Sequence, residues 1–395
     1  MKLIKDPIHG DVALGEDDLR LLDLPALQRL RRIKQIGLGD LVYPGANHTR
    51  FEHSLGTMHI AGELGQRMGL GLEDQRKMRV AALLHDVGHG PFSHTSEKFA
   101  VAASQIDHSQ LTRKRILCGA IAETLESIGI DPKETADTAT TEKSELGRIL
   151  QSQIGVDRMD YLMRDAHYTG VAYGVIDYER IMSTLVFHRG EVVIKEKGIQ
   201  AAESLLVARF LMYPAVYLHH VCRIADAMML RALEELRKSG VSVERIMEMD
   251  DLSLITELKE KDGIPHDFAV RILNRDLYKR AVYTSSAEVG DLNAVLEMSG
   301  HRDEVRKLED EVAESADLVP GSVLVDIQPK PSLDEVRIKV LCDGAVELLE
   351  ERSALVRSLT DAQWDYWRFG VYCARENLEK VKRVCERYGW RGIQK

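Results

Sequence analysis

A short segment that combines imidazoles with a carboxylate is the strongest chemical signal in this sequence. Residues 82–94 contain His85, Asp86, His89 and His94 behind a short apolar run. An imidazole offers a neutral nitrogen and an aspartate a charged oxygen, a mixture that suits a borderline divalent metal. Neighbouring side chains can share one ion only if the backbone holds them rigidly. The adjacent His85 and Asp86 therefore predict half of a metal site.

The remaining ligands are expected on either side of that pair. Upstream, His53 lies at the start of a periodic apolar segment, and downstream Asp157 opens a stretch with several carboxylates. Taken alone, each of these two residues is equally typical of a helix end or a salt bridge. Together with His85 and Asp86 they predict a site for one divalent ion (Mn, Fe, Zn, Co, Ni or Mg). An ion with five or six ligands would keep a position open for water or a phosphate oxygen.

Composition places the chain among globular proteins. With 395 residues, 44% hydrophobic and 29% charged, it can bury a large core, and we expect one large domain and a smaller one. The net charge of -10 argues against a broad nucleic-acid-binding surface, while leaving room for a local basic pocket. The five cysteines are scattered without a CxxC pair. They predict reduced thiols and a cytoplasmic location.

The most apolar stretch does not have the character of a membrane span. It runs from Leu205 to Val221 and contains Arg209, Pro214 and two histidines, which a membrane helix would not readily carry. We expect a buried helix that faces the active site, and no membrane partner. The first six residues also lack the apolar core of a signal peptide.

Hydrophobic periodicity predicts a mainly α protein. Residues 1–15 read as a short extended segment with a turn, and helical patterns dominate residues 228–318 and the tail at 361–388. Further helices are predicted from Glu16 and Pro25 onward, through His53 to Leu64, and at residues 76–85, 112–129, 144–165, 177–186 and 199–236.

A few segments read as strands instead. Glu191–Lys195 follows a turn and can pair with Leu185–Phe187, and two further strands are predicted at Val323–Ile327 and Glu335–Leu341. The expected architecture is a helical catalytic core at residues 1–235. A smaller α+β region at 236–395 would serve oligomerisation or regulation.

The ordered motifs resemble those of the HD-domain phosphohydrolases, in the branch of the deoxynucleoside triphosphate (dNTP) triphosphohydrolases that includes the SAM- and HD-domain enzymes. The likeness is dense over residues 1–180, thins by about residue 235 and is weak beyond. It implies a helical HD-domain core, cleavage of dNTP to deoxynucleoside and triphosphate, a homo-oligomer (dimer or tetramer) and activation by a nucleotide such as GTP or dGTP. The matching blocks are Asp6–Gly10, Gln28–Gln35, Tyr43–Ala46, His53, His85–His94 and Asp157–His167.

The resemblance also implies a proton-transfer pair, which matches His108 and Glu97 here. An acidic partner would orient the imidazole and raise its pKa, as an acid catalyst needs. Many relatives have Glu directly after this histidine, whereas this chain has Ser109. His89 and His94 are candidates for phosphate contact or proton transfer. Equally, they can hold the Gly-Pro loop by hydrogen bonds.

Three arginines are candidates for triphosphate binding because guanidinium pairs with phosphate oxygens in a fork. Arg50 and Arg158 stand close in sequence to proposed metal ligands, so we expect both to reach metal-bound phosphates. Arg209 can contact phosphate or form a salt bridge under a core helix.

Sugar recognition is expected along one helix face, because Asp157, Tyr161 and Asp165 are spaced four residues apart. The resemblance assigns Asp165 to the 3′ hydroxyl and places the Tyr161 ring where a ribose 2′ hydroxyl would clash. It also matches Gln35 to a sugar contact and Tyr217 to a residue near the base or ribose.

A second nucleotide site is implied by the same resemblance, at Asp23, Gln28 and Arg31. Asp23 can instead be a loop cap and Arg31 a surface residue. Two other functions remain open: an HD phosphohydrolase acting on nucleoside mono- or diphosphates or cyclic nucleotides, and a nucleotide-binding sensor with little turnover.

Overall fold

The structure, a computed structural model, describes residues 2–331 and 337–390, which group into two compact units. The first unit takes in residues 2–97, 106–216 and 337–360, and the second residues 98–105, 217–331 and 361–390. The units are therefore interleaved along the chain. The division at residue 235 stays a prediction about function.

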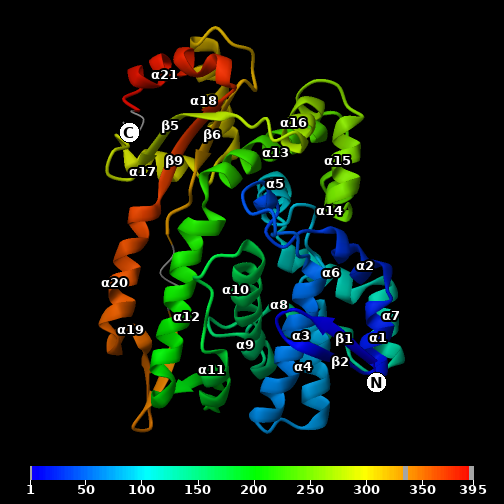
Figure 1. Ribbon diagram of the computed structural model, residues 1–395. Helices are drawn as coiled ribbons and strands as arrows, with labels where there is room; N and C mark the ends of the chain where they lie inside the picture. Colours follow the sequence, from blue (N-terminus) through cyan, green and yellow to red (C-terminus); the bar gives the residue numbers. More distant parts are fainter. Residues whose placement is uncertain (1, 332–336, 391–395) are drawn as a thin grey trace. The chain divides into compact units, whose positions relative to one another are not determined.

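The first unit is a set of helices with two small sheets. Figure 1 shows its β1–β2 hairpin and the helices from α1 to α12 in blue to green, and α19 in orange. Its elements are β1 (Lys2–Asp6), β2 (Gly10–Leu14), α1 (Glu16–Leu22), α2 (Pro25–Arg29), α3 (Arg50–Arg67), α4 (Leu72–Leu84), α6 (His108–Leu117), α7 (Gly119–Ser127), α8 (Pro132–Thr140), α9 (Glu145–Gln151), α10 (Val156–Thr169), α11 (Tyr178–Thr184), β3 (Leu185–His188), β4 (Glu191–Lys195), α12 (Ile199–Met212), β7 (Lys339–Cys342), β8 (Ala345–Leu348) and α19 (Leu349–Arg352).

The second unit combines helices with one sheet. Helices α5 (His94–Ser104) and α20 (Ala354–Ala362) begin in the first unit and end in the second. Its other elements are α13 (His220–Lys238), α14 (Val243–Glu248), α15 (Asp251–Lys259), α16 (Ile264–Leu273), β5 (Lys279–Ser285), α17 (Leu292–Met298), α18 (Arg302–Ser315), β6 (Val323–Ile327), β9 (Arg368–Cys373) and α21 (Leu378–Arg387).

Helices predominate, so the predicted mainly α fold with a smaller sheet-containing C-terminal part is confirmed. The predicted pairing of Leu185–Phe187 with the next strand is also confirmed, because β3 and β4 run antiparallel with Leu185 opposite Ile194. β7 lies parallel to β4, and β8 closes the sheet in the order β3-β4-β7-β8. The predicted strand at 335–341 is observed only as β7, and its residues 335 and 336 lie outside the described part.

Three predicted helices were wrong in their continuity. The helix at 112–129 breaks at Cys118, where Gly119 takes a positive φ of 66° and opens α7. The helix at 144–165 ends at Gln151 and restarts after Gly155, whose position is closed to a side chain because a Cβ would lie 2.4 Å from Leu150 O. The helix at 199–236 is interrupted by a π-helical turn at Tyr213–Tyr217 containing Pro214, which has no N–H to donate.

Three strands were missed: β8 in the first unit, and β5 and β9 in the second. β9 forms the centre of the antiparallel sheet β5-β9-β6, although residues 361–388 were predicted as helix throughout. β5 lies inside the region predicted as helical. Both strands pack in the core of that unit: Phe369, Val371 and Val282 are 0–2% exposed. Short buried strands of this kind lack the alternation that would distinguish them from helix.

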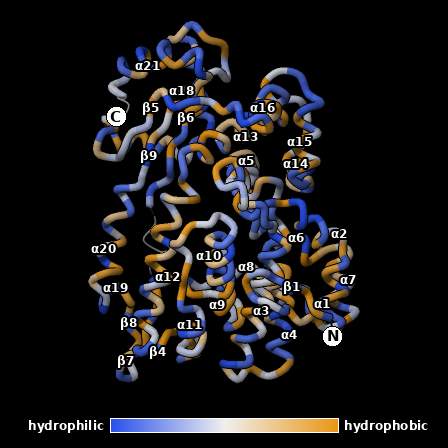
Figure 2. Tube along the Cα trace, in the orientation of Figure 1, coloured by the Kyte–Doolittle hydropathy of each residue, from blue (hydrophilic) through white to orange (hydrophobic). Residues whose placement is uncertain are grey.

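Burial of apolar helix faces holds the first unit together. Helices α3 and α4 pack on one another, with Met58, Ile60, Ala81 and Leu83 fully buried. Helix α3 begins at a capping box in which Glu52 accepts hydrogen bonds from the backbone and hydroxyl of Thr49. Figure 2 shows apolar and polar residues interleaved along these helices, as expected when only one face is buried.

Among the described residues, no single helix is long and apolar enough to cross a membrane. One bent pair, Glu196–Tyr217 with His220–Lys238, passes the same test of length and composition.

Candidate metal centre

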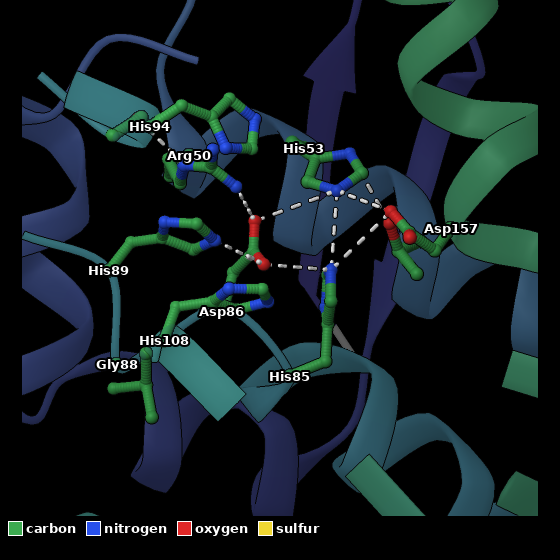
Figure 3. Close-up of polar contacts among 12 residues, drawn as sticks. Arg50, His53, His85, Asp86, Gly88, His89, His94, His108 and Asp157 are labelled. Atoms are coloured by element: carbon green, nitrogen blue, oxygen red, sulfur yellow. Dashed lines mark hydrogen bonds and ion pairs between the residues drawn. The ribbon is translucent and has the colours of Figure 1, made fainter. Parts of the chain in front are cut away.

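The four predicted metal ligands converge in the first unit (Figure 3). His53 Nε2 lies 3.0 Å from Asp157 Oδ1, 3.2 Å from His85 Nε2 and 3.7 Å from Asp86 Oδ2. His85 Nε2 lies 3.3 Å from Asp86 Oδ1 and 3.6 Å from Asp157 Oδ1. Donors bound about 2.1 Å from one ion stand roughly 3.0–3.4 Å apart in octahedral or tetrahedral geometry. The spacing of these atoms therefore fits a shared divalent cation.

The two imidazole rings are held with Nε2 facing the centre. His53 Nδ1 lies 2.7 Å from Asp160 Oδ2, and His85 Nδ1 lies 2.7 Å from Ala82 O. An acceptor at Nδ1 keeps a proton on that nitrogen, so Nε2 is the nitrogen left to bind an ion. This arrangement is the one a metal-binding histidine requires, so the residues present fit a metal ion.

Three helices deliver the ligands. His53 lies in the first turn of α3, His85 and Asp86 follow directly on the end of α4, and Asp157 lies in the first turn of α10. The loop after Asp86 packs tightly on α6: a Cβ at Gly88 would lie 2.2 Å from Thr112 N and 2.4 Å from His108 O. Gly88 thus allows the start of α6 to approach the metal ligands.

Arg50 is locked beside the ligands by a strained turn. Its Nη1 donates to Asp86 Oδ2 at 2.5 Å and its Nε to Ser93 Oγ at 2.9 Å. Phe92 and Ser93 both have positive φ, at 55° and 48°, a conformation uncommon for such residues and found at functional sites. Arg50 Nη2 is buried and has no hydrogen-bond partner among the described residues. It is free to bind an anion.

The predicted proton-transfer pair forms next to the centre. His108 Nδ1 donates to Glu97 Oε1, and the His108 ring stacks on His89 with 4.3 Å between ring centroids. His89 Nε2 lies 3.4 Å from Asp86 Oδ1, so it bridges the pair and the metal ligands. His94 is exposed, with its Nδ1 3.2 Å from Glu97 Oε2. One nitrogen or oxygen atom from each of His89, Glu97 and His108 lies within 4.8 Å of the others.

Electrostatics separate the roles of these histidines. Burial lowers the pKa of His108, but the hydrogen bond and charge of Glu97 outweigh it and raise that pKa above its usual value. Burial, aided by the charge of Arg50, brings the pKa of His89 well below its usual value, so this ring is neutral. His108 can therefore carry a proton that His89 does not.

The ligands themselves hold a proton when no ion is present. Burial lowers the pKa of His53, but hydrogen bonds with Asp157 and Asp160 outweigh it and bring the pKa to about 10. Burial raises the pKa of Asp157, but hydrogen bonds with His53 and His85 outweigh burial. The pKa therefore lies below its usual value, and the carboxylate stays charged. A metal ion must displace the proton from His53 on binding.

Asp157, Tyr161 and Asp165 all lie on α10, as the spacing predicted. Burial raises the pKa of Tyr161, so its phenol stays protonated. Asp165 Oδ1 lies 2.7 Å from His48 Nε2. Gln35 is 6% exposed and its Oε1 has no partner among the described residues. The sugar-binding roles of these side chains stay predictions.

Arg158 and Arg209 are each tied to the segment between α9 and α10. Arg158 Nη1 donates to Gln151 O and Ser152 O, and Arg209 Nη1 donates to Gln153 Oε1 at 3.0 Å. A phosphate contact for either arginine stays a prediction. Tyr217 lies in the second unit, which is not placed relative to this site.

The predicted activator residues lie together at the start of the first unit. Gln28 Nε2 donates to Leu22 O, and Arg31 Nε donates to Gln28 Oε1 at 2.9 Å while its guanidinium covers the Phe51 ring. Asp23 is exposed and ends α1. These contacts are compatible with either a nucleotide site or a purely structural role.

Sequence reasoning missed a buried group behind the ligands. Asp160 contacts His53, His9 and Arg164, and Arg164 also donates to Asp6. His48, which pairs with Asp165, was missed as well. The sequence places Asp160 one helical turn after Asp157, on the same side of the helix, but does not show that it contacts His53.

Comparison with known proteins places this site in a family. The HD domain model matches residues 50–165, the segment that contains all four proposed ligands, and the HD associated region matches residues 176–388. An uncharacterized protein of Methanocaldococcus jannaschii is 36% identical over 97% of this chain and 81% of its own length.

Two relatives have descriptions that name an activity. The deoxynucleoside triphosphate triphosphohydrolase SAMHD1 of Homo sapiens is 29% identical over 66% of this chain, which spans 50% of that protein. The crystal structure of a phosphohydrolase from Bacteroides thetaiotaomicron superposes with a TM-score of 0.73 at 25% identity, covering 95% of this chain and 99% of that one. The matched domains and the converging ligands together establish that this chain belongs to the HD-domain family of phosphohydrolases.

Proposed function

We propose that this protein hydrolyses dNTPs to deoxynucleoside and triphosphate, with one divalent metal ion bound by His53, His85, Asp86 and Asp157. One observation carries the proposal. Two imidazole nitrogens and two carboxylates converge beside a buried arginine with an unused Nη2 and a histidine–glutamate pair. This combination holds a cation, an anion and a mobile proton within one small region, which is what phosphoester hydrolysis needs.

Binding of the α-phosphate would fall to Arg50. Its Nη1 and Nε are already fixed by Asp86 and Ser93, so its Nη2 is aimed without further loss of side-chain freedom. A guanidinium stays charged at every relevant pH and forms strong hydrogen bonds with phosphate oxygens.

Proton transfer would fall to His108. A metal ion held by the four ligands would neutralise phosphate charge and make a water molecule more acidic. Water would attack the α-phosphorus as the bond to the 5′ oxygen breaks, and the proton that the water loses would pass to solvent. His108, kept protonated by Glu97, donates its proton to that oxygen, so deoxynucleoside and triphosphate leave.

Selection of deoxyribose is assigned to α10. Tyr161 and Asp165 follow Asp157 along the same helix, so a nucleotide whose phosphate lies at the ligands would run past both side chains. Asp165 would accept from the 3′ hydroxyl, and the Tyr161 ring would exclude a 2′ hydroxyl. Gln35, Arg158, Arg209 and Tyr217 are proposed as further substrate contacts.

The relatives support this substrate class. The SAMHD1 proteins of human and cattle are named for dNTP triphosphohydrolysis. By the same likeness we propose a homo-oligomer activated by a guanine nucleotide at Asp23, Gln28 and Arg31. A cytoplasmic location is proposed from the free cysteines.

One observation favours a smaller substrate. Arg158 and Arg209 already use an Nη1 on the segment between α9 and α10, which leaves Arg50 as the best-prepared phosphate ligand. Hydrolysis of a nucleoside monophosphate, which needs fewer cations, is therefore the second candidate.

Product analysis separates the two. Purified protein is incubated with each dNTP, NTP and deoxynucleoside monophosphate, in Mn²⁺, Mg²⁺, Co²⁺ or chelator, and products are resolved by ion chromatography. We expect triphosphate and deoxynucleoside to be released from dNTPs. This release should be lost in chelator and in the His85→Ala variant. Inorganic phosphate from monophosphates alone supports the second candidate, and nucleotide binding without turnover in any metal contradicts both.

A further inference from the structure

Asp160 lies behind the metal ligands with every acceptor position of its carboxylate in use. Its Oδ1 faces His9 Nε2 at 2.6 Å and Arg164 Nη2 at 2.9 Å. Its Oδ2 faces His53 Nδ1 at 2.7 Å and Arg164 Nε at 2.9 Å. A carboxylate offers about four lone-pair sites, so this group has no spare capacity.

Saturation of the carboxylate restricts how His53 can sit. Asp160 is fully buried and forms a two-point ion pair with Arg164, whose Nε and Nη2 each donate to one oxygen of the carboxylate. A charged carboxylate only accepts, so each histidine must present an N–H to it. His53 is left with one orientation, the one that turns its Nε2 toward His85 and Asp157.

His9 reaches this carboxylate from the N-terminal hairpin. The turn between β1 and β2 is shaped by Asp6, whose Oδ1 accepts from the backbone N–H groups of Ile8 and His9 at 2.9 Å. The other oxygen of Asp6 accepts from Arg164 Nη1 at 2.8 Å. The hairpin is therefore fixed to α10 at two points, at Asp160, which orients His53, and at Arg164, which pairs with Asp160.

A glycine on α3 makes room for this arrangement. A Cβ at Gly56 would lie 1.9 Å from Asp160 Oδ1 and 2.4 Å from Arg164 Nη2. Any side chain at position 56 would push the carboxylate away from its partners. The close approach of α3 and α10, which brings His53 to Asp157, also depends on the lack of a side chain at Gly56.

We propose that His9 is a positioning residue of the metal centre: by filling one oxygen of Asp160, the hairpin that carries it fixes the orientation of His53. The proposal rests on the metal site of the proposed function, and it is independent of which phosphate ester is hydrolysed. The N-terminal hairpin is thus part of the metal-binding apparatus, although it supplies no ligand.

Binding of Co²⁺ alone tests this role. The full chain, freed of metal, is titrated with Co²⁺ and followed by visible absorption, for wild type, His9→Leu and His9→Gln. Leucine fills the buried space but offers no donor, whereas glutamine can place an amide N–H where His9 Nε2 stands. We expect His9→Leu to weaken Co²⁺ binding about 10–100-fold, the usual loss when a residue supporting a metal ligand is removed.

Rescue distinguishes positioning from general destabilisation. His9→Gln is expected to bind Co²⁺ within about threefold of wild type, as is the control His266→Gln, a change at an exposed histidine of the second unit. Thermal unfolding of each metal-free variant verifies folding. If His9→Leu does not fold, His9→Asn, which keeps an amide but shortens its reach, replaces it and is expected to weaken binding similarly.

The proposal is overturned if a folded His9→Leu or His9→Asn binds Co²⁺ within threefold of wild type. Failure of the proposed function looks different. If wild type binds Co²⁺ in a manner sensitive to His9 but releases no triphosphate from any dNTP, only the substrate assignment is wrong. If His53→Ala binds Co²⁺ as wild type does, the metal site itself is wrong and both proposals fall.

Discussion

Both units bury charged side chains, but the two units arrange these side chains differently. In the second unit cations and anions alternate: Arg231 Nη1 lies 3.1 Å from Glu309 Oε2, and Arg302 Nη1 lies 2.9 Å from Glu309 Oε1. In the first unit, two imidazoles and two aspartates converge on one point, and without an ion the proton on His53 offsets part of the carboxylate charge. Paired ions satisfy each other permanently, whereas a divalent cation at this point would replace the His53 proton.

The comparison teaches how to tell a structural ion network from a site. Both are buried and rich in charge, so burial and charge alone do not separate them. The charges of the groups that face each other do separate them. In the second unit Arg223 lies beside Asp326, a cation beside an anion, whereas in the first unit His53 Nε2 lies beside His85 Nε2. We predict that mutations in the second unit change stability and those in the first change chemistry.

Removing a ligand should have the largest effect. His85→Ala is expected to lower dNTP hydrolysis by roughly 10³-fold or more, because the metal ion supplies several kcal/mol of stabilisation. Triphosphate release and metal content by mass spectrometry are the measurements. His266→Gln, at an exposed histidine, should change neither. A His85→Ala protein that retains bound metal and turnover would contradict the site.

Breaking the paired network should affect stability alone. Glu309→Gln removes the charge between Arg231 and Arg302, and leaving buried cations undercompensated is expected to cost about 3 kcal/mol of unfolding free energy. Denaturant unfolding measures this cost. Glu379→Gln, which alters an exposed ion pair with Lys382, should cost under about 1 kcal/mol. Loss of metal binding in Glu309→Gln would blur the distinction between the units.

Removing the carboxylate beside His108 should shift the pH profile. Glu97 raises the pKa of His108, so the protonated acid persists to higher pH in wild type. In Glu97→Gln the pKa falls, and the alkaline limb of kcat/KM should move to lower pH, with roughly 10²-fold lower activity at pH 8. An unchanged alkaline limb would assign the acid to another group.

Metal affinity should depend on pH in the direction set by His53. Because the pKa of His53 is about 10 without metal, binding at pH 7.5 must release close to one proton. Affinity is therefore expected to rise about tenfold per pH unit below pH 10. Calorimetric titration in two buffers of different ionisation enthalpy counts the proton. Binding without proton release would mean that the ligands are unprotonated in the apo state.

Opening the sugar side of the site should have the smallest effect. Tyr161→Ala removes the ring proposed to exclude a ribose 2′ hydroxyl. The ratio of kcat/KM for a dNTP over its NTP should fall roughly tenfold. Competition between the two nucleotides measures the ratio directly. A ratio that does not change would remove Tyr161 from sugar selection.

The helical core was predictable because hydrophobic periodicity is a local signal. The His85-Asp86 pair stands at the end of a periodic apolar run, whereas His53 and Asp157 were proposed as ligands only through their order along the chain and the family resemblance. Strand β9 was not predictable because it is buried along most of its length and shows no alternation of polar and apolar residues, and β5 shows no regular alternation either. The breaks at Gly119 and Gly155 were marked by glycine but overridden in our prediction by the surrounding periodicity.

The residues behind the site could not be assigned from sequence. His9 and Asp160 are separated by 151 residues and meet only because α10 and the N-terminal hairpin pack against α3. The sequence shows that both residues are polar, but it does not show that they contact each other. Likewise, the pairing of His48 with Asp165 depends on tertiary contact. The sequence shows which residue types are available as ligands, whereas the fold determines how their side chains are oriented.

The most direct test of the central claim is anomalous diffraction from crystals soaked in Mn²⁺. We predict a single strong peak in the first unit, within about 2.3 Å of His53 Nε2, His85 Nε2 and carboxylate oxygens of Asp86 and Asp157. A peak elsewhere, or none in a crystal where His53 turns its Nε2 away from His85, would contradict the account.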